Sequence, residues 1–316
     1  MPKNPVTITF SGDKQVIKNI LKKKKLLAKN DPTHKKIKTV LLLPGGGQEG
    51  VIEGGVCIAL EKLELIDAFD QLVGASRGAG AGYYTVAKEA AIGASIYFDD
   101  NVKNHFISFL RLWKIMDIDE VENVFRNVKP INLETFLSSR TTFLVGITDQ
   151  ETGVGRFVDA KAFGDPLSCV VASICFPVAD GGKVVALNKK LYVDGALSNP
   201  LPITWIIENL HPTDILIVLP EPLTPKKDFF YKLISASTAP LPKILNKNLR
   251  HQFATFLERF NAELAYLIGK REIPKGIHIG VIHPKQRSIK EVTMSRYLLQ
   301  EAALSAMNFT KNLFSA

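Results

Sequence analysis

Two short apolar runs constrain the fold most, because each ends at a glycine-rich turn and is followed by a helical segment. The run 39–43 leads into Gly45-Gly46-Gly47. The run 69–73, which is apolar apart from Asp70 and Gln71, leads into Gly74-Ala75-Ser76-Arg77-Gly78. Buried parallel strands have this form, since they carry continuous apolar residues and connect through helices. Strand-like and helix-like segments alternate to the end of the chain. We therefore expect an α/β fold with a mostly parallel central sheet and helices on both faces.

The chain is long and apolar enough for a sizeable core, with 316 residues of which 46% are hydrophobic. No apolar run approaches the roughly 20 residues that a membrane-spanning helix needs. The start of the chain lacks the apolar segment of a secretory signal, so we expect a cytoplasmic protein, with specialised export as the alternative. Three cysteines without a paired spacing argue against a disulfide framework and a zinc site, and we expect no metal and no cofactor.

The net charge of +9 is concentrated in residues 1–38, which hold eleven of the 40 basic residues and two of the 31 acidic ones. The simplest interpretation is a solubilising basic N-terminal arm or helix face. The functional alternative is peripheral contact with an anionic membrane, to which each lysine near the surface adds roughly 1 kcal/mol. Nucleic-acid binding is not expected, because the arm lacks interleaved aromatic residues.

Ser76 is the candidate nucleophile. It stands between glycines, directly after a predicted strand and before a helix of small residues, which is a nucleophile-elbow pattern. Asp194 is the candidate base, because it stands on a tight turn at the end of a predicted hairpin strand. A serine hydroxyl needs such a base to take its proton. His283 is the alternative base, as the best placed of the histidines that follow Asp194.

Gly45, Gly46 and Gly47 are the candidate oxyanion donors. Bare backbone N–H groups between a strand and a helix can point at a developing negative charge. The same residues do not fit a phosphate-binding loop, because no Gly-Lys-Ser/Thr follows them. The structural alternative is that the glycines only form a turn.

Four blocks within residues 40–203 together resemble a patatin-like phospholipase domain. They are the glycine loop at 45–50, the serine elbow at 74–78, Ala172-Ser173 leading to Pro177, and Asp194-Gly195-Ala196 followed by Asn199-Pro200. The resemblance implies a three-layer fold and a Ser–Asp dyad, with Ser76 as nucleophile, Asp194 as general base and glycine-loop amides as the oxyanion hole. It also implies metal-free hydrolysis of ester bonds in phospholipids or other acyl lipids, of the phospholipase A or lysophospholipase type.

Two positions depart from the family pattern. The family usually has a basic residue where this chain has Glu49, and small residues are commoner where it has Arg77. We expect Glu49 and Arg77 to pair across the site and exchange roles, since an unpaired carboxylate would oppose an oxyanion. The alternatives are that Glu49 faces solvent from the first helical turn, or that the site has drifted and no longer turns over lipid.

The expected function is therefore a lipid acyl hydrolase. A patatin-like acyltransferase would share the same acyl-enzyme, and a non-catalytic lipid- or protein-binding module would share the fold. We expect three segments: the basic arm at 1–38, the catalytic domain at 39–285, and a C-terminal helix within 286–316 packed on it. The sequence leaves the head group, the acyl chain length, the need for an activator and the oligomeric state open.

Overall fold

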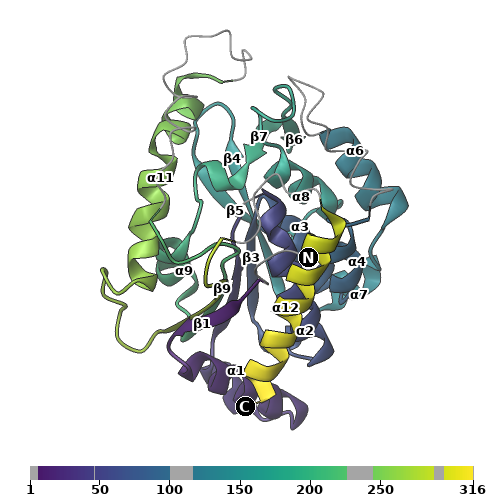
Figure 1. Cartoon of the computed structure of the whole chain (residues 1–316). Helices are drawn as coiled ribbons and strands as arrows, with labels where there is room; N and C mark the ends of the chain where they lie inside the picture. Colours follow the sequence, from purple (N-terminus) through teal and green to yellow (C-terminus); the bar gives the residue numbers. More distant parts are fainter. Residues whose placement is uncertain (1–5, 46, 100–116, 226–244, 288–294, 316) are drawn as a thin grey trace.

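A computed structural model describes residues 6–45, 47–99, 117–225, 245–287 and 295–315. In this part of the chain, nine strands form one sheet in the order β1-β9-β8-β2-β3-β4-β7-β6, with β5 paired to β4 (Figure 1). The strands are β1 (Ile8–Gly12), β2 (Thr39–Leu43), β3 (Gln71–Ala75), β4 (Thr142–Asp149), β5 (Gly155–Asp159), β6 (Val185–Leu187), β7 (Lys190–Asp194), β8 (Asp214–Val218) and β9 (His278–Pro284).

The five central strands, β9, β8, β2, β3 and β4, run parallel, and antiparallel strands flank them on both sides. Alternate residues of β2 enter two different cores: Leu41 and Leu43 face one, and Val40 and Leu42 face the other. This is the period of two that a strand buried on both faces requires. The expected α/β fold with a mostly parallel central sheet is confirmed.

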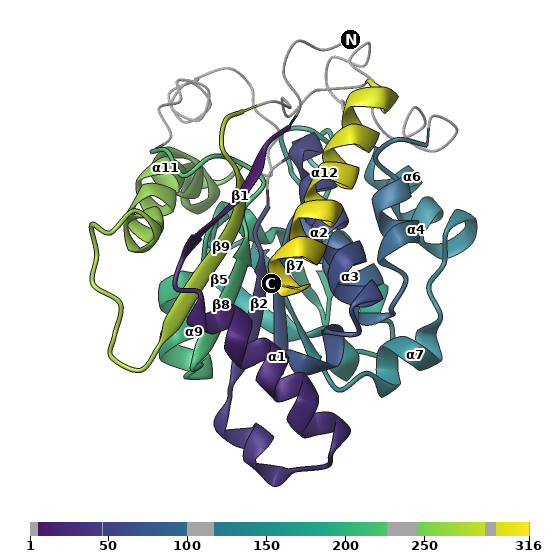
Figure 2. The ribbon, with the colours of Figure 1, turned by 60° about the horizontal axis from the view of Figure 1, so that its bottom comes forward.

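Helices cover both faces of the sheet, which gives three layers (Figures 1 and 2). On the Leu41 face, α1, α2, α3, α8 and α12 supply core residues, and on the opposite face α9 and α11 do so. The helices are α1 (Gln15–Ala28), α2 (Val51–Lys62), α3 (Arg77–Val86), α4 (Ala90–Ser95), α6 (Ile118–Asn123), α7 (Leu133–Ser138), α8 (Pro166–Ile174), α9 (Ile203–Leu210), α11 (Lys247–Leu267) and α12 (Arg296–Ser315). The short helical turns are η1 (Pro32–Lys36), η2 (Gly47–Gly50), η3 (Ile66–Ala68), η4 (Val124–Val128), η5 (Ala160–Ala162) and η6 (Gly195–Leu197).

The register of the sheet places the candidate residues at one edge. Leu43 at the end of β2 lies opposite Gly74 of β3, so the glycine loop and the serine elbow leave the sheet side by side. β7 runs antiparallel to β4 and sets Asp194 opposite Ile147. The carboxyl ends of parallel strands are where ligand sites form in open α/β sheets.

The described part of residues 1–38 packs on the sheet, so the basic segment is a helix face and an edge strand. β1 pairs antiparallel with β9 at the edge of the sheet. Val16, Ile17 and Ile20 of α1 are buried in the main core. Counting lysines does not reveal this amphipathic pattern. Apolar residues at helical spacing pack a helix on a core whatever charges lie between them.

Helix α1 crosses the amino edge of the parallel strands. Just before α1, the carboxylate of Asp13 pairs with His278 at the start of β9 over 2.6 Å. Asn19 donates a 2.8 Å hydrogen bond to Asp214 at the start of β8. One turn later, the buried Lys23 donates to Thr39 at the start of β2 over 3.1 Å. Successive turns of α1 therefore contact successive strands, at the edge opposite the candidate site.

The C-terminal helix α12 packs along α2 (Figures 1 and 2). The two backbones approach so closely that a Cβ built at Gly55 would lie 2.2 Å from the carbonyl oxygen of Ala303. Phe314 and Leu299 of α12 are buried in the main core. Among the described residues, no helix combines the length and the apolar character that crossing a bilayer requires.

Candidate active site

Ser76 stands on the sharp turn between β3 and α3. Its backbone has φ 54° and ψ −129°, a strained conformation for a residue with a side chain. The turn packs tightly, since a Cβ built at Gly78 would lie 1.9 Å from the carbonyl oxygen of Leu43. This is the nucleophile-elbow geometry that the sequence predicts, and it holds the serine hydroxyl above the carboxyl edge of the sheet.

Asp194 lies against that hydroxyl although 118 positions separate the two residues. Ser76 Oγ donates a 2.6 Å hydrogen bond to Asp194 Oδ2. The other carboxylate oxygen accepts from the backbone N–H of Ala196 at 2.8 Å. The backbone of Asp194 is fixed as well, because its N–H donates to the carbonyl of Cys175 and its carbonyl accepts from Thr148. The carboxylate is therefore pre-positioned to receive the proton of Ser76.

The electrostatic setting of Asp194 suits a proton acceptor near neutral pH. Burial raises the pKa of Asp194 to about 7, and the nearby carboxylate of Asp180 pushes it in the same direction. The hydrogen bonds from Ser76 and Ala196 and the charge of Arg77 oppose that rise. A carboxylate with an ordinary pKa would be a much weaker base toward a serine hydroxyl.

Ser173 holds the serine elbow from α8. It is fully buried, and its Oγ accepts a 2.8 Å hydrogen bond from the backbone N–H of Ser76. A buried backbone N–H needs such a partner, and here a side chain provides it. Ser173 belongs to the Ala172-Ser173 block of the family resemblance, but its contact with the nucleophile could not be read from the sequence.

The glycine loop begins against the nucleophile. A Cβ built at Gly45 would lie 2.8 Å from Cβ of Ser76 and 3.1 Å from Cβ of Ala196, so Gly45 sits between the two halves of the dyad. Gly47 begins the helical turn η2 that leads into α2. Gly46 lies outside the described residues. The start of this loop is therefore next to Ser76, where backbone N–H groups could stabilise an oxyanion formed on the substrate.

Arg77 makes its ion pair with Glu53, a residue that the sequence reading did not consider. Its Nε lies 3.2 Å from Glu53 Oε2, and its Nη2 also reaches the carbonyl of Pro44 at 3.4 Å. The arginine side chain crosses Gly50 so closely that a Cβ there would lie 1.7 Å from Arg77 Cδ. Arg77 therefore ties the serine elbow to both ends of the glycine loop.

The Arg77–Glu53 pair is buried, with side-chain exposures of 7% and 0%. Burial raises the pKa of Glu53 to about 7, and Arg77 opposes the rise. The pKa of Arg77 is raised, because attraction to Glu53 and Glu49 exceeds the effect of burial. Removing either partner would leave a charge or a polar group without compensation in the core.

Glu49 does not face solvent, which corrects that alternative: its side chain is 3% exposed. Its Oε1 lies 3.0 Å from Nε of Arg287, which follows β9. The same guanidinium reaches Glu221, beyond β8, at 3.7 Å. Glu49 also attracts Arg77 electrostatically. Glu49 is therefore paired with a second arginine, distant in sequence, and the exchange of roles between Glu49 and Arg77 stays a prediction.

Asp180 forms the turn that its Asp-Gly-Gly sequence predicts, and it also contributes to the site. One carboxylate oxygen accepts from the N–H groups of Gly182 and Lys183. The other accepts from Sγ of Cys175 at 3.2 Å. Burial raises the pKa of Asp180 to about 6. The negative charge of Asp180 raises the pKa of Asp194, so this turn residue makes Asp194 a stronger base.

His283 is not part of the site. Its Nε2 is 2.9 Å from Oγ of Ser11 on β1, and its Nδ1 is 2.9 Å from the carbonyl oxygen of Pro284. It stands on β9, which β8 and β2 separate from the strand that carries Ser76. Neighbouring strands are about 4.8 Å apart, so His283 cannot act on that hydroxyl. The described residues contain no cluster of side chains suited to a metal ion.

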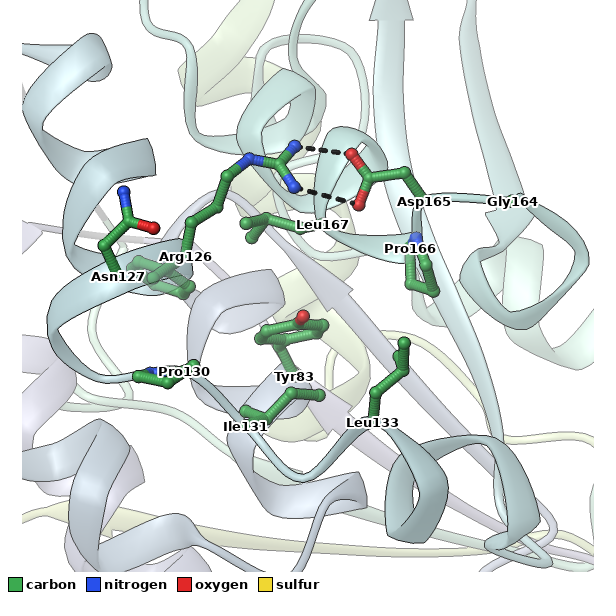
Figure 3. Close-up of a pocket in the computed structure, with 11 residues that line it drawn as sticks. Tyr83, Arg126, Asn127, Pro130, Ile131, Leu133, Gly164, Asp165, Pro166 and Leu167 are labelled. Atoms are coloured by element: carbon green, nitrogen blue, oxygen red, sulfur yellow. Dashed lines mark hydrogen bonds and ion pairs between the residues drawn. The ribbon is translucent and has the colours of Figure 1, made fainter.

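A pocket of about 370 Å³ opens elsewhere on the surface (Figure 3). Tyr83 of α3 lines it, seven residues after Ser76, together with Arg126 and Asp165. The guanidinium of Arg126 meets the carboxylate of Asp165 in two contacts, of 3.3 and 2.5 Å. Neither Ser76 nor Asp194 lines this pocket. It is therefore distinct from the place where the dyad would bind an ester.

Two comparisons relate the chain to known proteins. The model of the family described as patatin-like phospholipase matches residues 41–205, slightly more than half of the chain. The matched range includes the glycine loop, the elbow, Ser173 and Asp194. The chain is also similar to the crystal structure of VipD from Legionella pneumophila, with 12% identity, a TM-score of 0.41, and coverage of 88% of this chain and 67% of that chain. Among curated proteins, no sequence matches.

Proposed function

The chain belongs to the patatin-like phospholipase family, and on that premise we propose that it is a lipid acyl hydrolase that works through Ser76 and Asp194. The observation that carries the proposal is the 2.6 Å hydrogen bond from Ser76 Oγ to Asp194 Oδ2. A family match alone does not show that a site is intact, whereas this contact supplies both a nucleophile and its base. We propose phospholipids or other acyl lipids as the substrate class, with cleavage of the phospholipase A or lysophospholipase type.

The first half of the reaction forms an acyl-enzyme. Asp194 takes the proton of Ser76 as Oγ attacks the ester carbonyl carbon, and the carbonyl oxygen becomes an oxyanion. When the tetrahedral intermediate collapses, the bond to the alcohol oxygen breaks. The leaving alcohol receives the proton from Asp194, and the acyl group stays on Ser76. The pKa of about 7 lets Asp194 act as base first and as acid afterwards.

The second half hydrolyses the acyl-enzyme by the same proton route. A water molecule gives its proton to Asp194 while its oxygen attacks the acyl carbon. Collapse of this second intermediate releases the carboxylic acid, and the proton returns from Asp194 to Ser76. No step requires a histidine, which agrees with the position of His283 on β9.

Backbone groups of the glycine loop are the proposed oxyanion donors. The N–H of Ser76 is bound to Ser173 and is not available for this role. Gly45 lies directly against Ser76, and Gly47 begins η2. Each such donor is typically worth about 10²–10³ in rate when it is aimed at the oxyanion. The N-terminus of α3 adds a partial positive charge beside Ser76.

Release of fatty acid tests the proposal. Purified protein is incubated with a panel of phospholipids and lysophospholipids, and Ser76→Ala is compared with Ser138→Ala, which alters an exposed serine of α7. We expect release by the wild type and by Ser138→Ala, and none above background from Ser76→Ala. Equal release by both variants would exclude Ser76 as the nucleophile. Addition of an acceptor alcohol separates hydrolysis from acyl transfer, because transfer yields a new ester.

A further inference from the structure

Five lysines form a single row along helix α1 and the residues that flank it. Lys14, Lys18, Lys22, Lys25 and Lys29 follow one another at intervals of four, four, three and four residues. These intervals place side chains on one face of a helix. All five are exposed. At about 1.5 Å per residue the lysine row is about 22 Å long.

The lysine row is not neutralised within the described part of the chain. The ion pairs of α1 lysines belong to two others: Lys23 pairs with Asp70, and Lys24 with Glu64. Asp13 and Asp31 attract Lys18 and Lys29 at the two ends of the row, but neither makes an ion pair with a lysine of the row, and they are bonded to His278 and Thr33. The five ammonium groups thus form a positively charged surface, and their attraction for anions is limited mainly by solvent screening.

The lysine row is also held rigidly. Val16 and Ile20 on the opposite side of α1 are completely buried. The Lys23 side chain enters the core, where it bonds Thr39 and pairs with Asp70. Binding an anion here does not require the helix to fold first, so little ordering entropy opposes it.

The lysine row and the dyad lie at opposite edges of the sheet. Helix α1 crosses the amino ends of β9, β8 and β2. Ser76 instead follows the carboxyl end of β3, and Asp194 lies opposite Ile147 near the carboxyl end of β4. Figure 2 shows α1 at one end of the molecule. The five residues of β2 alone span about 16 Å. Charges on α1 are therefore more than one Debye length from the dyad at physiological salt.

The chemistry of the lysine row favours an anionic bilayer over a protein or a nucleic acid. The row lies on the exposed side of one helix. Protein interfaces are depleted in lysine and anchored by aromatic and arginine side chains, and single-stranded nucleic acids stack on aromatic rings. The lysine row contains neither aromatic nor arginine side chains. Anionic lipid headgroups move freely in the plane of the membrane and can gather beneath a line of ammonium groups.

We propose that the lysine row docks the protein on the surface of an anionic lipid bilayer, with the dyad facing away from that bilayer. Docking by itself does not depend on the proposed hydrolase activity. If the activity holds, the docked enzyme acts on lipid that reaches it from the opposite side, as monomers or from a second surface. The lysine row then localises the enzyme and does not load its active site.

Vesicle co-sedimentation tests the docking. The full chain is mixed with vesicles of phosphatidylcholine, or of phosphatidylcholine with about a third phosphatidylserine. One variant changes all five lysines of the row to glutamine. The control changes five exposed lysines elsewhere to glutamine, with the same loss of net charge: Lys189, Lys190, Lys270, Lys275 and Lys285.

We expect the row variant to bind anionic vesicles at least tenfold more weakly, and the control to lose less than threefold. Equal losses in the two variants would show that only net charge matters and would overturn the proposal. So would absence of wild-type binding, or preferential binding of a single-stranded RNA probe. None of these results depends on whether the protein hydrolyses lipid, so docking and catalysis can fail independently.

Fluorescence quenching tests the orientation. A fluorophore is attached through Ala28→Cys beside the lysine row, or through Val154→Cys, which is 53% exposed in the β4–β5 turn at the carboxyl edge. The three native cysteines are buried and should not react. Anionic vesicles carrying a nitroxide headgroup should quench the probe at 28 at least threefold more than the probe at 154. Equal quenching, or stronger quenching at 154, would reject the proposed orientation.

Discussion

Both edges of the central sheet bury carboxylates and cations, but they balance these charges differently. At the amino edge, Lys23 enters the core to meet Asp70, so opposite charges meet. At the carboxyl edge, Asp194 meets the neutral hydroxyl of Ser76, and a second carboxyl group, Asp180, raises its pKa further. The first arrangement attaches a helix. The second leaves a buried carboxylate only partly compensated, which costs stability when ionised and makes it a stronger base.

The largest expected effect lies in the dyad itself. Ser76→Ala and Asp194→Asn should each lower kcat/KM for an acyl ester by about 10³-fold or more, since one removes the nucleophile and the other its proton acceptor. Lys23→Met at the opposite edge should change kcat/KM by less than threefold. Steady-state kinetics on a soluble 4-nitrophenyl ester provides the comparison. A loss in Lys23→Met that approached the loss in Asp194→Asn would abolish the distinction between the two edges.

A second effect separates the buried Arg77–Glu53 pair from the half-buried Lys23–Asp70 pair. Arg77→Met leaves Glu53 buried without its partner, and such a loss typically costs about 3–5 kcal/mol of unfolding free energy. Lys23→Met should cost about 1–2 kcal/mol, because its partner Asp70 is 39% exposed and can turn to water. Urea unfolding at pH 8 measures both.

The Arg77→Met loss should shrink at pH 5, where Glu53 is protonated, because its pKa is already raised to about 7. The Lys23→Met loss should change less over the same range. A loss in Arg77→Met that is the same at both pH values would contradict the assignment of Glu53 as the group left uncompensated.

A third effect concerns stability against pH. The folded-state pKa of Asp194, about 7, is above its ordinary value of 3.8, so the folded state holds the proton more tightly. The resulting stabilisation is fully present below about pH 4 and is lost as the pH rises through 7. Asp194→Asn should therefore raise the unfolding free energy at pH 8 by on the order of 2 kcal/mol and should give no gain at pH 4.

Asp149→Asn is the matched control, because Asp149 is a turn carboxylate of β4 whose pKa is lowered, with backbone and side-chain hydrogen bonds that outweigh burial. Its stabilisation is present above the ordinary pKa and is lost as the pH falls through the lowered value. Asp149→Asn should therefore destabilise the protein at pH 8. Thermal unfolding of both variants at pH 4 and pH 8 checks the opposite signs. A gain in both variants, or in neither, would contradict the charge balance described above.

The smallest expected effect is a change in the pKa of Asp194. Asp180→Asn removes a carboxylate that raises the pKa of Asp194. The acidic limb of the kcat/KM profile should move to lower pH by less than one unit, while the limiting rate at high pH changes little. Asp149→Asn should leave the limb in place. A shift to higher pH in Asp180→Asn would mean that Asp180 does not act on Asp194 through its charge.

The sequence predicts those parts of the site that depend on local pattern. The run 39–43 is a strand, as its apolar residues on both alternate faces predict. The second strand, Gln71–Ala75, begins two residues later than the run 69–73, and the elbow at Ser76 follows from the glycines around it. The contact between Ser76 and Asp194 joins distant segments. The tight turn at Asp194 indicated a candidate base, and the family resemblance paired it with Ser76. The residue pattern within one strand or helix does not indicate which other segment packs against it.

The ion-pair network of the site could not be predicted in the same way. Glu49 and Glu53 stand four residues apart, so both face Arg77 from one side of the helical segment, and only packing decides the pairing. Gly50 gives a partial signal, because it leaves room for the Arg77 side chain. Arg287 comes from the far end of the chain, beyond β9. The buried face of α1 was missed for a related reason: the net charge of a segment does not indicate which side of a helix is apolar.

The most direct measurement is the rate at which a fluorophosphonate probe labels Ser76 as a function of pH, with the labelled residue identified by mass spectrometry. We expect labelling of the wild type at Ser76 alone, rising with pH through a midpoint near 7 as Asp194 loses its proton. Labelling of Asp194→Asn should be at least 100-fold slower and should lack that midpoint. Equal rates and equal pH profiles in the two proteins would contradict the dyad.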